Sequence, residues 1–310
     1  MNRSVQIIVT PGSGEGRAMG TARRLQDVLK ERGDTTAIRT YKSLAALTRW
    51  AKTCEADFTH LVCVGGDATQ SAAAAAAMRL SVPFVPVPNG FGNIFARTFG
   101  HPNRAEAVAE LLDRGKVRRV DVGMLNDDEI FLSHHSYGPL QQIQDTVEKG
   151  RGQPKARAVR YLAYYGMAKR FLIDARPPSL RVEVDGTLVA EGAALVTVAN
   201  VETYRGFLSL TPTASPIDGL FDVFIVPRTS KLRLATLLVR LMFKAPGRWD
   251  GALLCRGRRV TVTVNDRRQE ELRTVRRALP LLVPPGSVES LEQRMREADG
   301  PMESAPAKAN

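Results

Sequence analysis

A short stretch near residue 65 carries the residue types that bind phosphate. Gly65 and Gly66 follow the apolar run Val62–Val64, and Asp67 and Thr69 open a run of helix-forming residues. Glycines allow a phosphate to approach the backbone closely, and the N–H groups at the start of a helix attract negative charge. In an open parallel sheet, ligands bind at the carboxyl ends of the strands, where this turn is expected. The stretch predicts a phosphate site, although plain strand–helix turns also use paired glycines.

Two further turns of the same character strengthen this prediction. Pro88–Asn93 contains Gly90 and Gly92 and follows the next apolar strand, about one β-α-β unit further along the chain. Thr10–Gly14 ends the first strand in the same way. Turns that follow neighbouring parallel strands line one edge of the sheet, so three of them can surround one polyphosphate. None has the spacing of the P-loop or of the Gly-x-Gly-x-x-Gly motif.

The elements that must position these turns alternate between strand and helix patterns. The pattern predicts strands Val5–Val9, Thr35–Arg39, His60–Val64 and Phe84–Val87, and helices Ala18–Glu31, Leu44–Lys52, Ser71–Arg79 and Asn93–Phe99. Such alternation is typical of a parallel sheet covered by helices on both faces. We therefore expect an α/β domain with a parallel sheet over residues 1–122, and the family resemblance described below implies that this domain binds a nucleotide.

Beyond residue 117 the strands become longer and alternate apolar with polar residues, and Asp185-Gly186 is typical of a hairpin turn. The predicted strands are Arg119–Val122, Glu129–His134, Leu180–Val184, Leu188–Ala190, Ala194–Ala199, Leu220–Val226 and Arg259–Val264. We expect an antiparallel, β-rich and sandwich-like domain over residues 123–283, with helices near 158–174 and 231–243. From Met295 the composition becomes that of a frayed tail, which we assign to residues 299–310.

The composition is that of a globular protein with excess positive charge. The 310 residues are 44% hydrophobic, and no apolar run approaches the roughly 18 residues of a membrane-spanning helix. Three scattered cysteines favour a reducing compartment, so we expect a cytoplasmic protein. The net charge is +12, and residues 228–277 hold 14 Lys and Arg against four acids, which favours an anionic partner. Basic residues do not alternate with aromatic ones, so no nucleic acid is expected.

Four segments together resemble the diacylglycerol kinase and sphingosine kinase family of lipid kinases. Val64–Thr69 is similar to its Gly-Gly-Asp-Gly-Thr signature, and Pro88–Ala96 to its Pro-x-Gly-Thr-x-Asn-Asp loop. Thr10–Gly14 resembles its opening Asn-Pro-x-Ser-Gly, and Pro212–Val223 its Pro-x-Ala and Asp-Gly-x-x-Asp-Val segment. The four segments occur in the order of the family, and together they are specific.

The resemblance implies that the γ-phosphoryl group of ATP passes to a lipid hydroxyl, assisted by Mg²⁺, in a cleft between the two domains. Leu281–Leu291 resembles the family's last strand, so the C-terminal segment, at about 284–298, would return to the first domain. Asp218 would match an acid that helps to bind the metal. The residues that would bind the nucleotide are Thr10, Gly65, Gly66, Asp67, Thr69, Gly90, Gly92 and Asn93.

The catalytic base is the one role that the resemblance leaves open. The family places Asp-Gly-Glu near the end of its second domain, whereas the corresponding stretch here reads Asn265-Asp266-Arg267. Asp266 is the candidate base, Glu270 or Glu271 are alternatives, and another base or a loss of catalysis also fits. The other departures from the family's glycine, threonine, aspartate and asparagine are Ala68, Phe91, Ile94 and Thr10.

Three functions follow from these residues. The leading hypothesis is an ATP- and Mg²⁺-dependent kinase of a membrane lipid such as diacylglycerol or a sphingoid base. The alternatives are a weak or inactive relative that binds nucleotide or lipid, and an NAD kinase-like enzyme, since a Gly-Gly-Asp loop also marks that group. A lipid substrate implies peripheral docking on an anionic membrane, and the leucine stripe of residues 231–243 fits either that role or core packing. A homodimer is compatible with the sequence.

Overall fold

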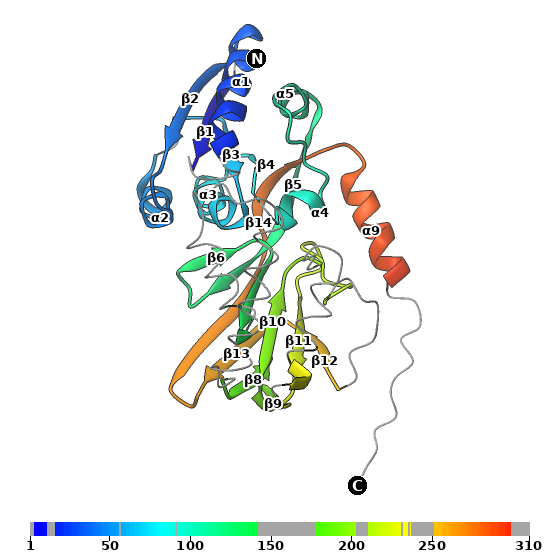
Figure 1. The fold of residues 1–310 in the computed structure, drawn as a ribbon. Helices are drawn as coiled ribbons and strands as arrows, with labels where there is room; N and C mark the ends of the chain where they lie inside the picture. Colours follow the sequence, from blue (N-terminus) through cyan, green and yellow to red (C-terminus); the bar gives the residue numbers. More distant parts are fainter. Residues whose placement is uncertain are drawn as a thin grey trace.

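The first part of the chain forms a parallel sheet of four strands (Figure 1). The structure, a computed structural model, describes residues 3–10, 16–55, 57–90, 92–139, 141, 178–202, 210–230, 232–234, 236 and 251–298. The strands pair in the order β2-β1-β3-β4, and their bounds are β1 (Ser4–Val9), β2 (Thr35–Thr40), β3 (His60–Gly65) and β4 (Phe84–Pro88). The four predicted strands and their parallel pairing are confirmed.

Helices cover both faces of this sheet. Helices α1 (Arg17–Glu31) and α5 (Ala105–Arg114) lie on one face, and α2 (Leu44–Thr53) and α3 (Asp67–Leu80) on the other. Successive side chains of a strand point to opposite faces, so Ile7 packs with the first pair of helices and Ile8 with the second. Alanines of α3 are buried in the core between the sheet and helices α2 and α3. Their small side chains let α3 pack closely on the strands.

The rest of the described chain is rich in antiparallel strands, as predicted. Four of them, β7 (His134–Tyr137), β10 (Leu195–Ala199), β11 (Phe221–Val226) and β12 (Leu253–Gly257), form a separate sheet in the order β12-β11-β10-β7. Others belong to the larger sheet: β5 (Lys116–Leu125), β6 (Glu129–Phe131), β8 (Leu180–Val184), β9 (Thr187–Ala193) and β13 (Arg259–Val264). An apolar core joins residues of both sheets. The predicted helices near 158–174 and over most of 231–243 fall outside the described residues.

A single long strand joins the two parts of the chain. Strand β14 (Arg268–Val283) starts beside β13 in the β-rich part and meets β4 through Leu281 and Phe84 (Figure 1). The first and second parts therefore share one continuous sheet. The predicted return of the C-terminal segment to the first part is confirmed, because Leu291 is buried in the core formed with α2 and α3. The strand itself ends at Val283, and the rest of Leu281–Leu291 leads into α9 (Ser287–Ala298). Met295 lies in this helix, so the tail begins later than its composition indicated, and residues 299–310 are outside the described chain.

Asp121 fixes the junction between the two parts. Its carboxylate is buried on β5 and accepts one hydrogen bond from Gly219 N–H and one from Arg277 N–H, each 2.7 Å long. Arg277 lies at the irregularity of β14 and has a φ of 49°, a conformation that side chains rarely adopt. Since Asp121 binds two backbone segments far from it in sequence, it holds the irregular strand against the turn at residue 219.

His101 joins the end of α4 (Ile94–Thr98) to β14. Its imidazole is buried, with Nε2 2.9 Å from Leu282 O and Nδ1 3.3 Å from Ala96 O. A neutral imidazole has one N–H, and the shorter distance assigns that proton to Nε2. Burial disfavours the charged ring and lowers the pKa of His101 to about 4.

Acidification is expected to destabilise the fold through His101. The unfolded chain binds a proton at this residue near pH 6.5, whereas the folded chain does so only near pH 4. The contribution is therefore full above pH 6.5 and is lost between these values, by about 3 kcal/mol in all. Urea unfolding from neutral pH down to about pH 5 measures it. His101→Gln, which keeps a donor towards Leu282, should lose less stability over this range, and equal losses would contradict the assignment.

Candidate nucleotide-binding site

The two glycine turns that follow β3 and β4 pack directly against each other. A Cβ atom added to Gly90 would lie 2.5 Å from Gly66 Cα, and one added to Gly92 would lie 2.7 Å from Asp67 Oδ2. Asn89 N–H also donates a 3.0 Å hydrogen bond to Gly65 O. The close approach of the Gly66 backbone leaves no room for a side chain at Gly90, and a side chain at Gly92 would displace the Asp67 carboxylate. The prediction that the turns meet at one edge of the sheet is confirmed.

Asp67 is the side chain that connects the turns. It is the first residue of α3, and its two oxygens accept hydrogen bonds from Asn93 N–H at 2.7 Å and Ile94 N–H at 2.6 Å. These are the first amides of α4, so the carboxylate occupies the positive end of that helix. Burial raises the pKa of Asp67, and the hydrogen bonds from Ile94 and Asn93 oppose that rise. The geometry thus gives Asp67 a positioning role between the two turns.

Asn93 and Gln70 brace the turns from within. The Asn93 side chain accepts a hydrogen bond from Gly90 N–H and donates one to Gly90 O, both 2.7 Å long. Gln70 is fully buried, and its Nε2 donates to Gly65 O at 2.9 Å and to Val87 O at 3.4 Å. Sequence reasoning assigned Asn93 to nucleotide contact and missed Gln70. A polar residue one turn into a helix that follows two glycines is the signal that could have found Gln70.

The start of α3 is the open end of this arrangement. The N-cap residue of α3 is Gly66, which has no side chain that could cap the first backbone amides of the helix. Thr69 is buried, and its hydroxyl lies 3.3 Å from the Thr10 hydroxyl at the end of β1. The structure therefore brings together all eight residues predicted to bind the nucleotide, Thr10, Gly65, Gly66, Asp67, Thr69, Gly90, Gly92 and Asn93. The rest of the predicted turn after Thr10, and Phe91, fall outside the described residues.

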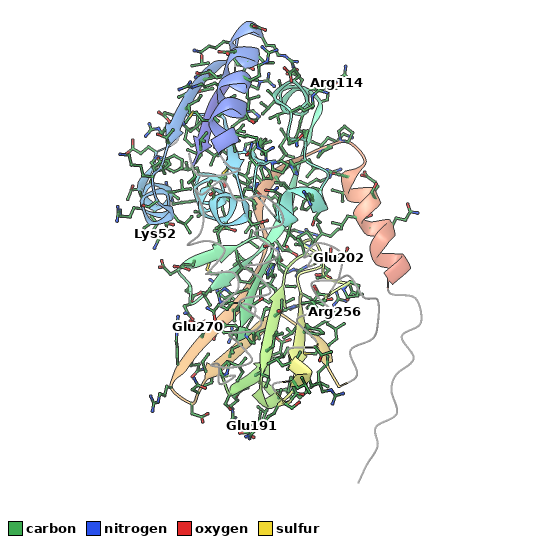
Figure 2. The ribbon with its side chains drawn as sticks, viewed as in Figure 1. Lys52, Arg114, Glu191, Glu202, Arg256 and Glu270 are labelled. Carbon is green, nitrogen blue, oxygen red and sulfur yellow. The ribbon has the colours of Figure 1, made fainter. Side chains whose placement is uncertain are left out.

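Asp218, the predicted metal ligand, lies in the turn before β11 and is bound to an arginine. Arg256, labelled in Figure 2, lies in the β-rich part of the chain. Its Nη2 donates to Asp218 Oδ2, and its Nε donates to Asp222 Oδ1 at 2.9 Å. Burial raises the pKa of Asp218, and the nearby carboxylates of Asp222 and Asp121 add to that rise. The described residues include no group of three His, Cys, Asp or Glu side chains placed to hold a metal ion. The geometry at Asp218 does not fit a metal site.

Asp266 is exposed in the turn between β13 and β14, where Asn265 and Asp266 both have positive φ. From Arg268 to Leu281, β14 extends on the order of 40 Å before it meets β4. The hairpin accordingly lies at the far end of the β-rich part from α3 and α4 (Figure 1). A catalytic base would have to lie near the glycine turns. The structure places Asp266 away from them and so does not support its assignment as the base.

The alternative bases, Glu270 and Glu271, are engaged in ion pairs. Glu270 is buried in the β-rich part, where it pairs with Arg268 and lies 4.0 Å from His135 Nε2 (Figure 2). Glu271 is half-buried on β14, and one of its oxygens lies 3.5 Å from Arg259 Nε. In the described part of the chain no hydrogen bond or ion pair joins either carboxylate to the glycine turns, so the geometry supports neither of them as the base.

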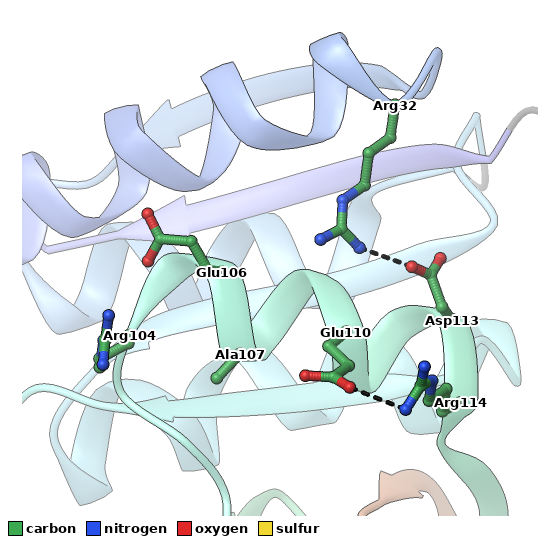
Figure 3. A pocket seen from close by; sticks show the side chains of 7 residues that line it. All are labelled: Arg32, Arg104, Glu106, Ala107, Glu110, Asp113 and Arg114. Carbon is green, nitrogen blue, oxygen red and sulfur yellow. Dashed lines mark hydrogen bonds and ion pairs between the residues drawn. The ribbon is translucent and has the colours of Figure 1, made fainter.

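A groove of about 420 Å³ opens between α1 and α5, on the face of the sheet opposite α3 (Figure 3). Its charged side chains pair with one another: Arg32 Nη1 lies 2.5 Å from Asp113, and Arg114 Nη1 lies 3.0 Å from Glu110. Because these charges neutralise each other and the glycine turns do not line the groove, we place the candidate site at the turns.

Comparison with known families agrees with the sequence resemblance. Residues 4–125 match the family described as the diacylglycerol kinase catalytic domain. Residues 144–274 match the YegS C-terminal NAD kinase beta sandwich-like domain. The first match contains both glycine turns, and the two matches together span most of the chain. The chain therefore carries a segment that matches the diacylglycerol kinase catalytic domain, followed by one that matches the YegS C-terminal domain.

Individual relatives support the same placement. The diacylglycerol kinase of Mycobacterium tuberculosis (strain ATCC 25618 / H37Rv) is 28% identical over 241 residues, which are 75% of this chain and 76% of that protein. The diacylglycerol kinase of Staphylococcus saprophyticus is 26% identical over 244 residues and 77% of each chain. A solved diacylglycerol kinase structure from Bacillus anthracis superposes with a TM-score of 0.65 at 19% identity, over 92% of this chain and 98% of that one. This superposition shows the shared fold.

Gly90→Ala is expected to force the two glycine turns apart. The new methyl group would overlap a backbone atom of Gly66, so the fold should lose about 1–3 kcal/mol and the affinity for ATP should fall about tenfold or more. Calorimetric titration with ATP and thermal unfolding measure both effects. The control is Gly20→Ala on α1, where the added Cβ would contact nothing within 4 Å. Wild-type affinity in Gly90→Ala would refute the close packing of the turns as a requirement for binding.

Proposed function

We propose that the protein is an ATP-dependent lipid kinase that transfers the γ-phosphoryl group of ATP to the hydroxyl of a membrane lipid such as diacylglycerol or a sphingoid base. The observation that carries this proposal is the open start of α3 beside two interlocked glycine turns. It is supported by the matching catalytic domain and by relatives named diacylglycerol kinase.

The triphosphate would bind at the first amides of α3, where backbone N–H groups and the helix dipole stabilise negative charge. Asp67 and Asn93 would position the binding site without touching the ligand, because both keep the second turn in place beside these amides. The acceptor hydroxyl would attack the γ-phosphorus, the bond to the β-phosphate oxygen would break, and the hydroxyl proton would leave, giving ADP and a lipid phosphate. Such transfers depend mainly on positioning and charge neutralisation. Magnesium would arrive with ATP, since the described carboxylates offer no separate site for it.

We further propose that the basic part of the chain docks on an anionic membrane. In the described part of the chain no helix is both long enough and apolar enough to cross a bilayer. Leu232, at the start of the stretch predicted to be a basic helix, is 73% exposed and is flanked by the exposed residues Arg228 and Arg233. Leu254 is exposed on the edge strand β12, close to Arg256. Leucines that insert beside arginines are typical of peripheral membrane contact.

The kinase proposal predicts that labelled phosphate passes from ATP to a lipid acceptor. The purified chain is incubated with γ-labelled ATP, Mg²⁺ and detergent micelles that contain diacylglycerol or sphingosine, and with NAD in a parallel reaction. Label should appear in the lipid. Asp67→Asn should reduce the rate about a hundredfold, because the amide places a donor against the α4 amides and shifts the second turn.

Asp128→Asn is the control for the kinase assay and should keep full activity, because this exposed carboxylate forms a surface ion pair with Lys52. Label on NAD would replace the proposal with an NAD kinase-like function. ATP binding without transfer to any acceptor would identify a non-catalytic relative.

The membrane proposal predicts sedimentation of the protein with vesicles that contain phosphatidylglycerol, and little with phosphatidylcholine alone. Binding should weaken at high salt, because exposed charges are then screened. Leu232→Glu should reduce binding several-fold, since it replaces an inserted side chain with a repelled charge. The matched control is Leu188→Glu on β9, a leucine that is also exposed but lies near Glu183 and Glu191. Equal binding to both kinds of vesicle would exclude electrostatic docking.

A further inference from the structure

The two carboxylates at Asp218 and Asp222 both accept hydrogen bonds from donors of the chain itself. Asp218 Oδ1 accepts a 2.9 Å hydrogen bond from Leu220 N–H, and Asp218 Oδ2 pairs with Arg256 Nη2. Asp222 Oδ1 accepts from Arg256 Nε at 2.9 Å, and Asp222 Oδ2 accepts from the Thr213 hydroxyl. Each of the four carboxylate oxygens therefore already faces a hydrogen-bond donor.

We propose that Arg256 is a built-in cation for the turn at residues 216–219, in the place where the family resemblance suggested a metal ion. A guanidinium is always charged, and its planar fork can donate to two carboxylates at once. Mg²⁺ instead requires an octahedron of oxygen ligands, and here N–H and O–H donors approach the oxygens that such an ion would use. The turn should therefore fold without a divalent cation.

The register between β11 and β12 in the smaller sheet positions Arg256 beside Asp222. Arg256 on β12 pairs directly opposite Asp222 on β11 in the antiparallel ladder. Asp222 is 1% exposed and Arg256 is 32% exposed, so a carboxylate that would be costly to bury alone meets a charge that reaches in from the surface. The same turn is held on its other side by Asp121, which accepts from Gly219 N–H.

Three carboxylates thus converge on this turn, and Asp222 and Asp121 each raise the pKa of Asp218 through repulsion. Asp121 is satisfied by two backbone amides that carry no net charge, Gly219 N–H and Arg277 N–H. Arg256 supplies positive charge to the other two carboxylates, Asp218 and Asp222. Its removal should leave a site with excess negative charge, to which a divalent ion can bind.

The test uses the full chain, stripped of metal by a chelator and without nucleotide, so that its outcome does not depend on the proposed kinase activity. Thermal unfolding is measured with chelator and with added Mg²⁺ or Mn²⁺, and bound Mn²⁺ is measured by electron paramagnetic resonance. The wild type should unfold at the same temperature in all conditions. Arg256→Met should unfold roughly 5 °C lower in chelator and recover part of that loss with Mn²⁺. Arg258→Met, an exposed arginine on the same segment, should behave like the wild type.

Measurements on the wild type keep the proposal testable even where Arg256→Met does not fold. If chelator lowers the unfolding temperature of the wild type and Mg²⁺ restores it, Arg256 does not replace a metal. Wild-type binding of Mn²⁺ that is lost in Asp218→Asn would overturn the proposal in the same way. An Arg256→Met variant as stable in chelator as the wild type would also overturn it, because the guanidinium would then not be needed.

Discussion

The candidate site depends on one buried carboxylate, Asp67, placed between the starts of two helices. Removing a carboxylate from water costs several kcal/mol, and each charge-assisted hydrogen bond returns about 1.5–3 kcal/mol. Two such bonds to Asn93 and Ile94, together with the dipole of α4, can offset that cost only while the second glycine turn lies beside the first. The contact of Gly90 with Gly66 meets the same requirement from the backbone side. Charge burial and backbone packing thus select one arrangement.

This arrangement treats the two neighbouring helix starts differently. The positive end of α4 is already occupied by the Asp67 carboxylate, whereas that of α3 has no side-chain cap in the described chain. The edge of the sheet therefore offers one open set of amides to an anion rather than two. This asymmetry is the basis of the proposed triphosphate site, in which the second turn would position the first without a P-loop.

Buried carboxylates also connect segments that are distant in sequence elsewhere in the fold. Asp121 ties β5 to the turn at Gly219 and to the irregular part of β14 near Arg277. Asp222 meets Arg256 across two strands of the smaller sheet. In each case an acid is satisfied only by groups that the tertiary structure supplies. Strand β14 runs from the β-rich part into the parallel sheet, where it pairs with β4.

The sequence by itself determined the local elements and the family. Apolar runs with glycines placed β3, β4 and their turns correctly, because strand period and glycine conformation are local properties. It missed α5, β12 and the length of β14, and it gave Asp218 and Asp266 roles that their surroundings do not support. Only the tertiary structure decided that Asp67 and Asn93 brace the site and that Arg256 binds Asp218. Those assignments depend on which donors come within hydrogen-bond distance, and residue type and spacing along the chain do not encode that distance.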